Sequence, residues 1–509
     1  MQDSSDSSDA QGYITDTPYT IKFYARQTPG QLVTAALTSG VAAPDLERPF
    51  TYADFGCGRG MTLLVLASVY PHAEFFGIDV NEEHVVEAQS RADAAGLTNL
   101  KFLARSFAGL TEADLPPLDM ATAHGVYSWV SEGVRLEMRD AIRARLRPEG
   151  LAMISYNTRA GYASMDPLQK LLMGLAEVAP GDPVEKRRAA IAQVMRLQET
   201  KQLYFERYPA ADQRVERWPK HDETYLFHEF FNAYWYPLSF IEVAGEMRQA
   251  GLHFCGDPVY PTWISGRGRK SRAAWLDDPV MLEEMACVAL AQAFRYDLFT
   301  QSEPMNLYRT HRIADDALFG LTQPPQTGEV AKLAKGQNAT AAVLQLLSEG
   351  PLSFAEIGAS PATEKFGDNL PLLLRAAMAT GLVGLYRKAD SGPAAAASAS
   401  GLRVTTELGR SLLRDDTLAR HMLPLPAQRF GGAVQVPPMM TAVLLAAAEG
   451  EEGMAQRVAQ RVHDLTGVTK DGRKKESFEN ILQRAENAIG RFQSQWRSFL
   501  LQSGVVEPV

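Results

Sequence analysis

Three glycines at every second position follow an acidic residue in the run Asp54-Phe-Gly-Cys-Gly-Arg-Gly60. Residues 51–55 are apolar and β-prone, and residues 61–69 are typical of a helix. A strand, a tight glycine turn and a helix let the backbone approach a ligand closely at the carboxyl end of a parallel strand. We therefore predict that this segment binds a nucleotide-like ligand.

A second acidic residue, Asp79, ends the next apolar segment, Ala73-Glu-Phe-Phe-Gly-Ile-Asp-Val80. In a doubly wound parallel sheet, an acid at the tip of the second strand lies beside the glycine turn. Its carboxylate can accept hydrogen bonds from both hydroxyls of a ribose. Asp79 is therefore predicted to bind the sugar of the ligand.

The glycine spacing and the acid before it distinguish between two ligands. A dinucleotide fingerprint reads G-x-G-x-x-G and places a pyrophosphate at the helix N-terminus. Here the spacing is G-x-G-x-G, and Asp54 would repel such an anion. A ligand with an amino group and a sulfonium suits that carboxylate, so we predict S-adenosylmethionine in preference to a dinucleotide or an empty turn.

Alternating strands and helices must position these residues. Strands and helices that alternate at this spacing predict an α/β fold with a parallel sheet covered on both faces. The predicted strands are 51–55, 73–80, 100–107, 118–127 and 151–157, and the predicted helices are 31–39, 61–69, 81–95 and 135–146.

The sequence resembles class I S-adenosylmethionine-dependent methyltransferases, and more narrowly the group that carries a methyltransferase regulatory domain. That group includes the rickettsial-type lysine methyltransferases that act on outer-membrane protein. The resemblance extends from Tyr19 to about Gln301. The segments that carry it are 54–60, Gly77-Ile-Asp-Val-Asn81, His124-Gly-Val-Tyr-Ser-Trp129, Ile154-Ser-Tyr-Asn-Thr158, Phe227-His-Glu-Phe-Phe-Asn232, Trp235, Pro237 and Phe294-Arg-Tyr-Asp-Leu-Phe299.

The resemblance implies a Rossmann-like sheet of seven strands, completed by 252–255 and an antiparallel strand at 295–299. Residues 159–242, which follow the fifth strand, would form a helical insertion over the ligand. The predicted domains are a disordered tail (1–16), a methyltransferase core (17–158 and 243–305), a helical insertion that forms a lid (159–242), a winged-helix-like domain (306–425) and a C-terminal helical region (426–509).

The resemblance also implies which residues contact the cofactor. Ser106 departs from the family pattern, because many class I enzymes carry an adenine-contacting acid there, and Arg159-Ala-Gly161 replaces a more usual Leu-Pro-Gly. The predicted cofactor-binding residues are Tyr19, Asp54, Phe55, Gly56, Cys57, Gly58, Gly60, Asp79, Val80, Ser106, Phe107, His124, Gly125 and Trp129.

Methyl transfer from a sulfonium is an in-line displacement in which positioning and desolvation supply much of the catalysis. A lysine acceptor must first lose a proton, since its reference pKa is about 10.4, and an aromatic pocket lowers that pKa. A nearby Tyr, His or Glu could accept the proton. The predicted catalytic residues are Tyr24, His124 and Tyr156, and the predicted substrate-binding residues are Tyr127, Asn157, His228, Glu229 and Trp235.

Each of these assignments has a plainer alternative. His228 and Glu229 lie in an aromatic-rich stretch, which is typical of a core with one hydrogen-bonded histidine as well as of a cation-binding pocket. The tyrosines and Trp129 suit cofactor packing as well as catalysis. We predict no metal site, because Cys57, Cys255 and Cys287 lack metal-ligand spacing.

The last third of the sequence predicts helices at 338–347, 353–357 and 370–380, and a strand pair, 382–386 with 402–405, around an Ala- and Ser-rich loop at 388–401. This pattern indicates a winged-helix-like domain. The third helix is rich in leucine and alanine with one arginine, which favours protein contact over DNA binding. The final helix, 477–501, is expected to pack on preceding helices, with self-association as a homodimer as the alternative.

Composition bounds the class of protein. The chain has 509 residues, a net charge of −9 and 46% apolar residues, typical of a globular enzyme and unlike a general nucleic-acid binder. It contains no apolar run of about 18 residues, so we predict no membrane span. The acidic N-terminus does not resemble a secretory signal, which favours the cytoplasm. A basic loop at 265–272 is expected to be solvated, or else to contact an acidic macromolecular surface.

These observations lead to a main functional hypothesis, a protein-lysine N-methyltransferase. Its partner would be a protein substrate, such as an outer-membrane or surface protein before export. A methyltransferase for a lipid, sugar or metabolite is the second hypothesis. An S-adenosylmethionine-binding regulatory or scaffold protein with little turnover is the third.

Overall fold

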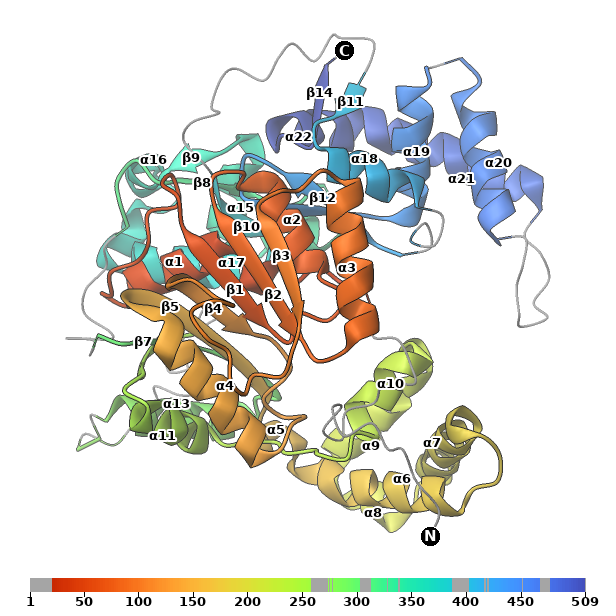
Figure 1. The fold of residues 1–509 in the computed structure, drawn as a ribbon. Coiled ribbons are helices and arrows are strands. Elements are labelled where there is room, and N and C mark those ends of the chain that lie inside the picture. The colour runs from red at the N-terminus through yellow and green to blue at the C-terminus, as the bar shows by residue number, and fades with distance from the viewer. Residues whose placement is uncertain are drawn as a thin grey trace.

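The computed structural model describes residues 21–257, 273, 275–276, 278–302, 313–326, 328–336, 339–386, 402–415, 418, 421–450, 452–466 and 477–508. At its centre is a sheet of seven strands in the order β3-β2-β1-β4-β5-β7-β6 (Figure 1). The strands are β1 (Thr51–Phe55), β2 (Glu74–Asp79), β3 (Leu100–Ala104), β4 (Leu118–Ala123), β5 (Leu146–Asn157), β6 (His253–Gly256) and β7 (Phe294–Thr300).

The first five strands run parallel, and β7 is antiparallel to both β5 and β6. The class I methyltransferase sheet predicted from the sequence is therefore confirmed, including its two final strands. The first strand shows how the sequence sets the faces: Tyr52 belongs to one apolar core, and Ala53 and Phe55 belong to the other. This alternation leaves Asp54 on the opposite side of the strand from Phe55.

Helices cover both faces of the sheet. Apolar residues of α1 (Pro29–Thr38), α2 (Met61–Val69) and α3 (Glu82–Ala94) pack in the first core. Apolar residues of α4 (Glu132–Arg145) and α11 (Phe240–Gln249) pack in the second, and α13 (Pro279–Ala289) packs against α11. The helices begin at caps typical of N-termini, such as the Asn81 side chain that accepts from the His84 amide.

The insertion between β5 and α11 is helical and has a third apolar core of its own, which runs from Tyr162 to Trp235. Figure 1 shows it at the opposite end of the molecule from the C-terminal helices. Its helices are α5 (Arg159–Tyr162), α6 (Asp166–Val178), α7 (Pro183–Glu199), α8 (Leu203–Arg207), α9 (Pro209–Glu216) and α10 (Glu223–Phe230), with short 3-10 turns at Ala163–Met165 and Trp218–Lys220.

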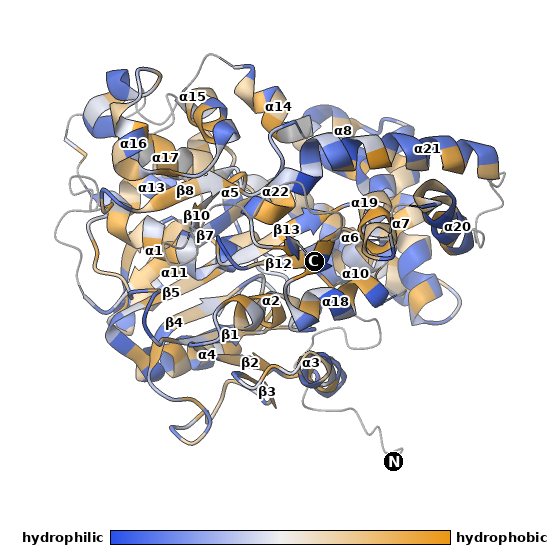
Figure 2. Cartoon of the chain, turned by 90° about the horizontal axis from the view of Figure 1, so that it is seen from above, coloured by the Kyte–Doolittle hydropathy of each residue, from blue (hydrophilic) through white to orange (hydrophobic). Residues whose placement is uncertain are grey.

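The C-terminal region, 318–508, packs on α1, α2 and α3, and its apolar residues belong to the same core as these helices. Figure 2 shows its helices with polar outer faces. It contains β8 (Leu318–Leu321), α14 (Gly328–Ala334), α15 (Ala339–Leu346), β9 (Leu352–Ser353), α16 (Phe354–Ala359), α17 (Leu370–Ala379), β10 (Val383–Tyr386), β11 (Leu402–Val404), α18 (Glu407–Arg414), β12 (Leu423–Ala427), β13 (Gly432–Val436), α19 (Pro438–Ala448), α20 (Met454–Thr466), α21 (Phe478–Arg491), α22 (Arg497–Gln502) and β14 (Val506–Pro508).

The strand pairing predicted for the winged-helix-like domain is wrong. The three predicted helices form as α15, α16 and α17, but β10 pairs with β8, and β11 pairs with β14 at the far end of the chain. The two segments therefore do not form a wing. A second correction concerns the final helix, which a π-helical turn at Phe492–Trp496 divides into α21 and α22. The loop at 388–401 and the basic loop at 265–272 lie outside the described residues.

Candidate active site

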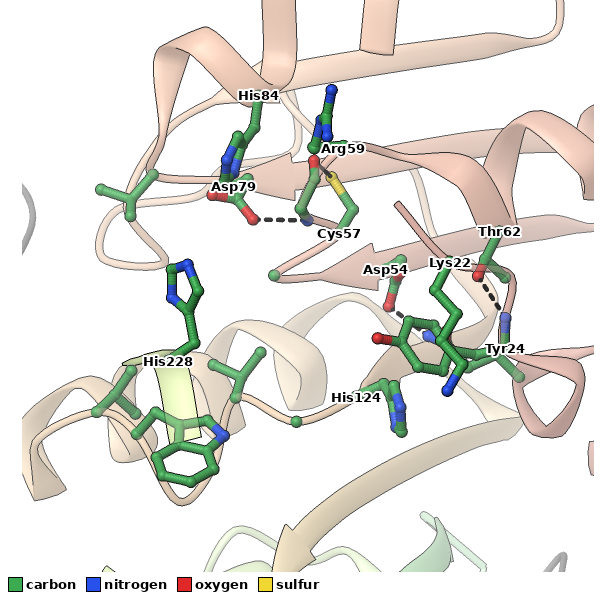
Figure 3. Close-up of a pocket in the computed structure, with 18 of the residues that line it drawn as sticks. Lys22, Tyr24, Asp54, Cys57, Arg59, Thr62, Asp79, His84, His124 and His228 are labelled. Atoms are coloured by element: carbon green, nitrogen blue, oxygen red, sulfur yellow. Dashed lines mark hydrogen bonds between the residues drawn. The ribbon is translucent and has the colours of Figure 1, made fainter. Parts of the chain in front are cut away.

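The five parallel strands of the sheet end at a cavity of about 570 Å³, which the helical insertion closes from the other side. This volume lies within the range of small-molecule sites. In Figure 3, Asp79 and His84 lie on one side of the cavity and Lys22, Tyr24, Asp54 and His124 on another, with His228 of α10 facing them. The cavity therefore brings three distant parts of the sequence together.

The glycine loop after β1 forms the floor of the cavity. Gly56, Gly58 and Gly60 have φ values of 80°, 52° and 70°, which side-chain-bearing residues rarely adopt. Space is also short: a Cβ on Gly60 would lie 2.5 Å from the Phe102 ring, and one on Gly56 would lie 2.3 Å from Val126. These positions therefore require glycine, while the loop residues between them, Cys57 and Arg59, line the cavity.

Asp79, at the end of β2, is fixed beside this loop. Its Oδ2 accepts a hydrogen bond from the Gly58 amide at 2.7 Å, and its Oδ1 accepts one from the Asn81 amide at 2.9 Å. Burial raises the pKa of this carboxyl, while the two amides act in the other direction. The carboxylate is held where one ligand hydroxyl or two could reach it.

Asp54 is nearly fully buried at the end of β1. Its Oδ1 accepts hydrogen bonds from Gln27 Nε2 at 2.9 Å and from Thr122 Oγ1 at 2.7 Å. Burial raises the pKa of Asp54 to about 7, and the hydrogen bonds from Thr122 and Gln27 oppose that rise. A cationic group in the cavity would supply the missing charge and lower this pKa.

His124 lies among the aromatic side chains of Tyr24, Phe294 and Tyr296. Its Nδ1 is 2.7 Å from Ser155 Oγ, which also accepts from the Gly125 amide at 2.9 Å. The His124 ring stacks on Tyr296 and lies 4.1 Å from the Tyr24 ring. Burial, with the charges of Lys22 and Arg26, lowers the pKa of His124 to about 3, so the imidazole is neutral and a weak base.

A buried carboxylate marks the part of the cavity under the insertion. Glu229 of α10 accepts a hydrogen bond from the Tyr162 hydroxyl at 2.5 Å and one from Asn157 Nδ2 at 3.2 Å. Burial raises its pKa, while hydrogen bonds from Tyr162, Asn157 and Tyr225 and the charge of Arg214 oppose the rise. We call Asn157, Tyr162, Tyr225, His228 and Glu229 the acceptor end of the cavity.

Most of the residues predicted for the site line this cavity, although their roles remain predictions. Tyr19 lies outside the described residues. Those that line the cavity are Tyr24, Asp54, Gly56, Cys57, Gly58, Gly60, Asp79, Val80, Ser106, Phe107, His124, Gly125, Trp129, Asn157, His228 and Glu229.

Four predicted residues do not line the cavity. Phe55 packs in the second core, on the other face of β1 from Asp54. Tyr156, predicted to be catalytic, is in the same core, and its hydroxyl donates a hydrogen bond to Asp297 away from the cavity. Tyr127 is buried and donates to Glu246 at 2.6 Å, and Trp235 packs in the core of the insertion. Neither is placed to bind substrate as predicted.

Several lining residues were missed by the sequence interpretation. Gln27 and Thr62 carry no local pattern that marks them, because their role depends on which strand they lie beside. Tyr162 follows Thr158 by one helical turn, which could have indicated it. The missed polar and aromatic residues are Lys22, Gln27, Arg59, Thr62, His84, Arg105, Tyr162, Tyr225, Asn232, Phe294 and Tyr296.

The described residues contain no group of three or more His, Cys, Asp or Glu side chains that could hold a metal ion. Among the helices in the described part of the chain, none is long and apolar enough to cross a membrane.

Comparison with family models and known proteins identifies the class. Residues 47–196 match a methyltransferase domain, and residues 222–301 match a domain described as a predicted methyltransferase regulatory domain. An uncharacterised protein of Synechocystis sp., sll1526, is 30% identical over 358 residues, which span 68% of this chain and 71% of that protein. Together with the fold and the cavity, these matches define a class I S-adenosylmethionine-dependent methyltransferase.

More narrowly, the chain belongs to the methyltransferases that carry this regulatory domain. The structure of PKMT2 from Rickettsia typhi has a similar fold, with a TM-score of 0.69 at 17% identity, covering 96% of this chain and 100% of that one. The same protein is known in complex with AdoHcy. A Rickettsia prowazekii protein, RP028, is 30% identical over 158 residues, which span 31% of this chain and 62% of that protein.

The match to the regulatory domain has a structural consequence. Residues 222–301 include α10, which carries His228 and Glu229, and strands β6 and β7. These strands complete the central sheet. In this chain the regulatory-domain segment is therefore an integral part of the catalytic fold and lines its cavity.

Proposed function

We propose that S-adenosylmethionine lies across the glycine loop, with its amino group near Asp54 and its ribose near Asp79. Three observations support this placement. Gly56 and Gly60 of the loop have no room for a side chain, the cavity has a suitable volume, and Asp54 is a buried carboxylate whose raised pKa a bound cation would lower. Ser106 and Phe107 line the wall beyond Asp79, where the adenine would bind.

The acceptor that suits this site best is the side-chain amine of a protein lysine. The observation that carries this proposal is the buried carboxylate of Glu229, on the opposite wall from the glycine loop, among Tyr162, Tyr225 and Trp129. A carboxylate in aromatic surroundings attracts an ammonium through charge and cation–π interaction. Neutral hydroxyl acceptors of sugars or metabolites gain less from such a pocket.

The cofactor, when bound, supplies an electrophilic methyl group on a sulfonium. The protein has to orient the amine and remove its proton. Burial raises the pKa of Glu229, which makes the carboxylate a stronger base toward an ammonium. Tyr162 and Asn157 hold the carboxylate in place, and the aromatic walls exclude water, which lowers the pKa of the amine itself.

A similar structure and the family resemblance also support a protein acceptor. PKMT2 from Rickettsia typhi has a similar fold over nearly the whole chain. We propose a protein partner, such as a surface or outer-membrane protein met before export, on the strength of the family resemblance.

The test is transfer of label from methyl-labelled S-adenosylmethionine to a cell lysate, followed by separation of protein from small molecules. We expect label in protein, and methyl-lysine after acid hydrolysis. Label in the small-molecule fraction would replace lysine by a metabolite acceptor. Binding of S-adenosylhomocysteine without any label transfer would instead indicate a regulatory protein. Heat-denatured protein is the control for chemical methylation.

A further inference from the structure

Arg59, the charged residue of the glycine loop, is held by helix α3. Its Nε donates to Glu87 Oε2 at 2.7 Å and its Nη2 to Glu87 Oε1 at 2.5 Å, a bidentate pair. The side chains are only 22% and 30% exposed. Burial opposes the charge of Glu87, but the hydrogen bonds and charges of Arg59 and Arg91 outweigh burial and lower its pKa. The loop is thus anchored by an ion pair that is partly shielded from water.

The same ion pair continues into the C-terminal region. Glu87 also accepts hydrogen bonds from Arg91, one turn further along α3. Arg91 Nη1 in turn donates to Asp415 Oδ2 at 2.7 Å. Asp415 directly follows α18, which lies beside α2 and α3 (Figures 1 and 2). Four alternating charges, Arg59, Glu87, Arg91 and Asp415, therefore connect the cofactor loop to a segment more than 300 residues away.

Apolar and polar packing joins the same two regions at other points. Strands β12 and β13 pack on α2, the helix that follows the loop. Gly431 has a φ of 59° and lies so close to Tyr70 that a side chain there would collide with the tyrosine hydroxyl. Because β12 also packs on α18, these contacts place α18 beside the helix that follows the loop.

A further link runs through α1. Gln31 Nε2 donates to the Met378 carbonyl of α17 at 3.4 Å, and a Cβ placed on Gly30 would lie 3.4 Å from Leu385 Cβ of β10. Gln27, two residues before α1, donates to Asp54 in the cavity. Both carboxylates predicted to hold the cofactor, Asp54 and Asp79, are therefore backed by segments that the C-terminal region supports.

We propose that the C-terminal region positions the cofactor loop, and that Asp415 is a positioning residue that acts on cofactor affinity through Arg91, Glu87 and Arg59. It does not touch the cavity itself. This inference depends on S-adenosylmethionine binding at the glycine loop and not on the nature of the acceptor. It gives the C-terminal region a role in binding the methyl donor.

The test measures the Kd of S-adenosylhomocysteine by calorimetry for the full chain and for Asp415→Asn, Glu87→Gln and the double variant. We expect Asp415→Asn to raise the Kd about fivefold, which corresponds to ~1 kcal/mol. The double variant should bind no more weakly than Glu87→Gln, because residues in one network are not additive. Added salt should weaken binding less in Asp415→Asn than in the natural chain.

Glu407→Gln is the matched control, since Glu407 lies on α18, the helix that Asp415 follows, and pairs with Arg410 of that helix. It should leave the Kd unchanged. Two results would overturn the proposal. One is an Asp415→Asn variant that lowers the unfolding temperature but binds normally, which indicates a bracing role alone. The other is a double variant whose effects add, which shows that Asp415 does not act through Glu87.

Discussion

Two regions pack against the central sheet in different ways. The C-terminal region shares one continuous apolar core with α1, α2, α3 and one face of the sheet. The helical insertion instead has a core of its own, and it meets the strand ends through a hydrogen bond from Asn157 to Glu229 and through packing of Trp129 and Ala293. The glycine-loop end and the acceptor end of the cavity therefore belong to different apolar cores. The glycine-loop end of the cavity, where we propose that the methyl donor binds, belongs to the shared core, while the acceptor end includes residues of a separately packed unit.

At the glycine-loop end of the cavity, we expect the largest effect from Asp79→Ala. We expect it to weaken S-adenosylhomocysteine binding roughly thousandfold, because hydrogen bonds to charged groups contribute ~1.5–3 kcal/mol each. The loss of its bond to Gly58 also frees the loop. Calorimetry measures the effect, and Asp93→Ala on the exposed side of α3 serves as the control. Unaltered binding by Asp79→Ala would refute the ribose assignment.

Truncation of one side chain in each core tests whether the shared core and the insertion core are independent. Leu425→Ala, in the shared core, should lower the free energy of unfolding of the whole protein by about 3 kcal/mol. Phe230→Ala, in the core of the insertion, should instead speed proteolysis within 159–238 and leave S-adenosylhomocysteine binding within about twofold, since distant sites act independently. Equal loss of cofactor binding in both variants would show that the insertion core and the shared core do not act independently.

At the acceptor end, Glu229→Gln should lower kcat about hundredfold, the lower range for removal of a general base. Binding of S-adenosylhomocysteine should be retained, because Glu229 lies on α10 of the insertion and not on the glycine loop. Turnover of a labelled protein acceptor and calorimetry together measure the two effects. Glu223→Gln, at the other end of α10 and paired with Arg188, is the control. Full activity of Glu229→Gln would exclude this carboxylate as the base.

The smallest expected effect is on pH dependence at the cofactor end. A carboxylate with a pKa of about 7 must ionise before it can hold an amino group, so affinity should rise about fivefold from pH 6 to pH 7. The amine stays protonated over this range, since its pKa is about 7.7 or higher. Calorimetry in buffers of different ionisation enthalpy should detect proton release on binding. Asp54→Asn should bind more weakly and without this dependence.

The raised pKa of Asp54 should also affect the stability of the protein without ligand. The folded state holds the Asp54 proton more tightly than the unfolded state, so this residue stabilises the fold at low pH. That contribution is lost as the pH rises from the ordinary value of 3.8 toward about 7. Denaturant unfolding of Asp54→Asn should lack this part of the pH dependence. An identical profile in both proteins would mean that Asp54 is ionised in the empty cavity.

The sequence allowed the sheet and the glycine loop to be predicted, because their patterns are local. A β-prone run, glycines at fixed spacing and an acid at the next strand end lie within a few dozen residues. The partners of β10 and β11 could not be predicted, since each pairs with a strand whose position depends on the whole fold. Period-two alternation could have separated Tyr156 from Asn157, because neighbours in a strand face opposite sides of the sheet.

The acceptor end was predicted in part for a similar reason. Tyr225, His228 and Glu229 lie in one conspicuous aromatic segment, whereas Tyr162 lies much earlier in the chain and reaches the cavity only because the insertion folds back over the strand ends. Trp235 lies in the same aromatic segment but packs inward. Composition marks such a segment, and helical packing decides which of its side chains face the ligand.

The ion pair between Arg91 and Asp415 also bears on how the protein is made. The two residues are 324 positions apart. At about 5–20 residues per second, a ribosome needs about 16 to 65 s to reach the second after the first. During that interval the strands around the glycine loop lack the region that completes their core, and their apolar face is open to chaperones. We therefore expect the nascent methyl-donor site to stay unfinished until synthesis is nearly complete.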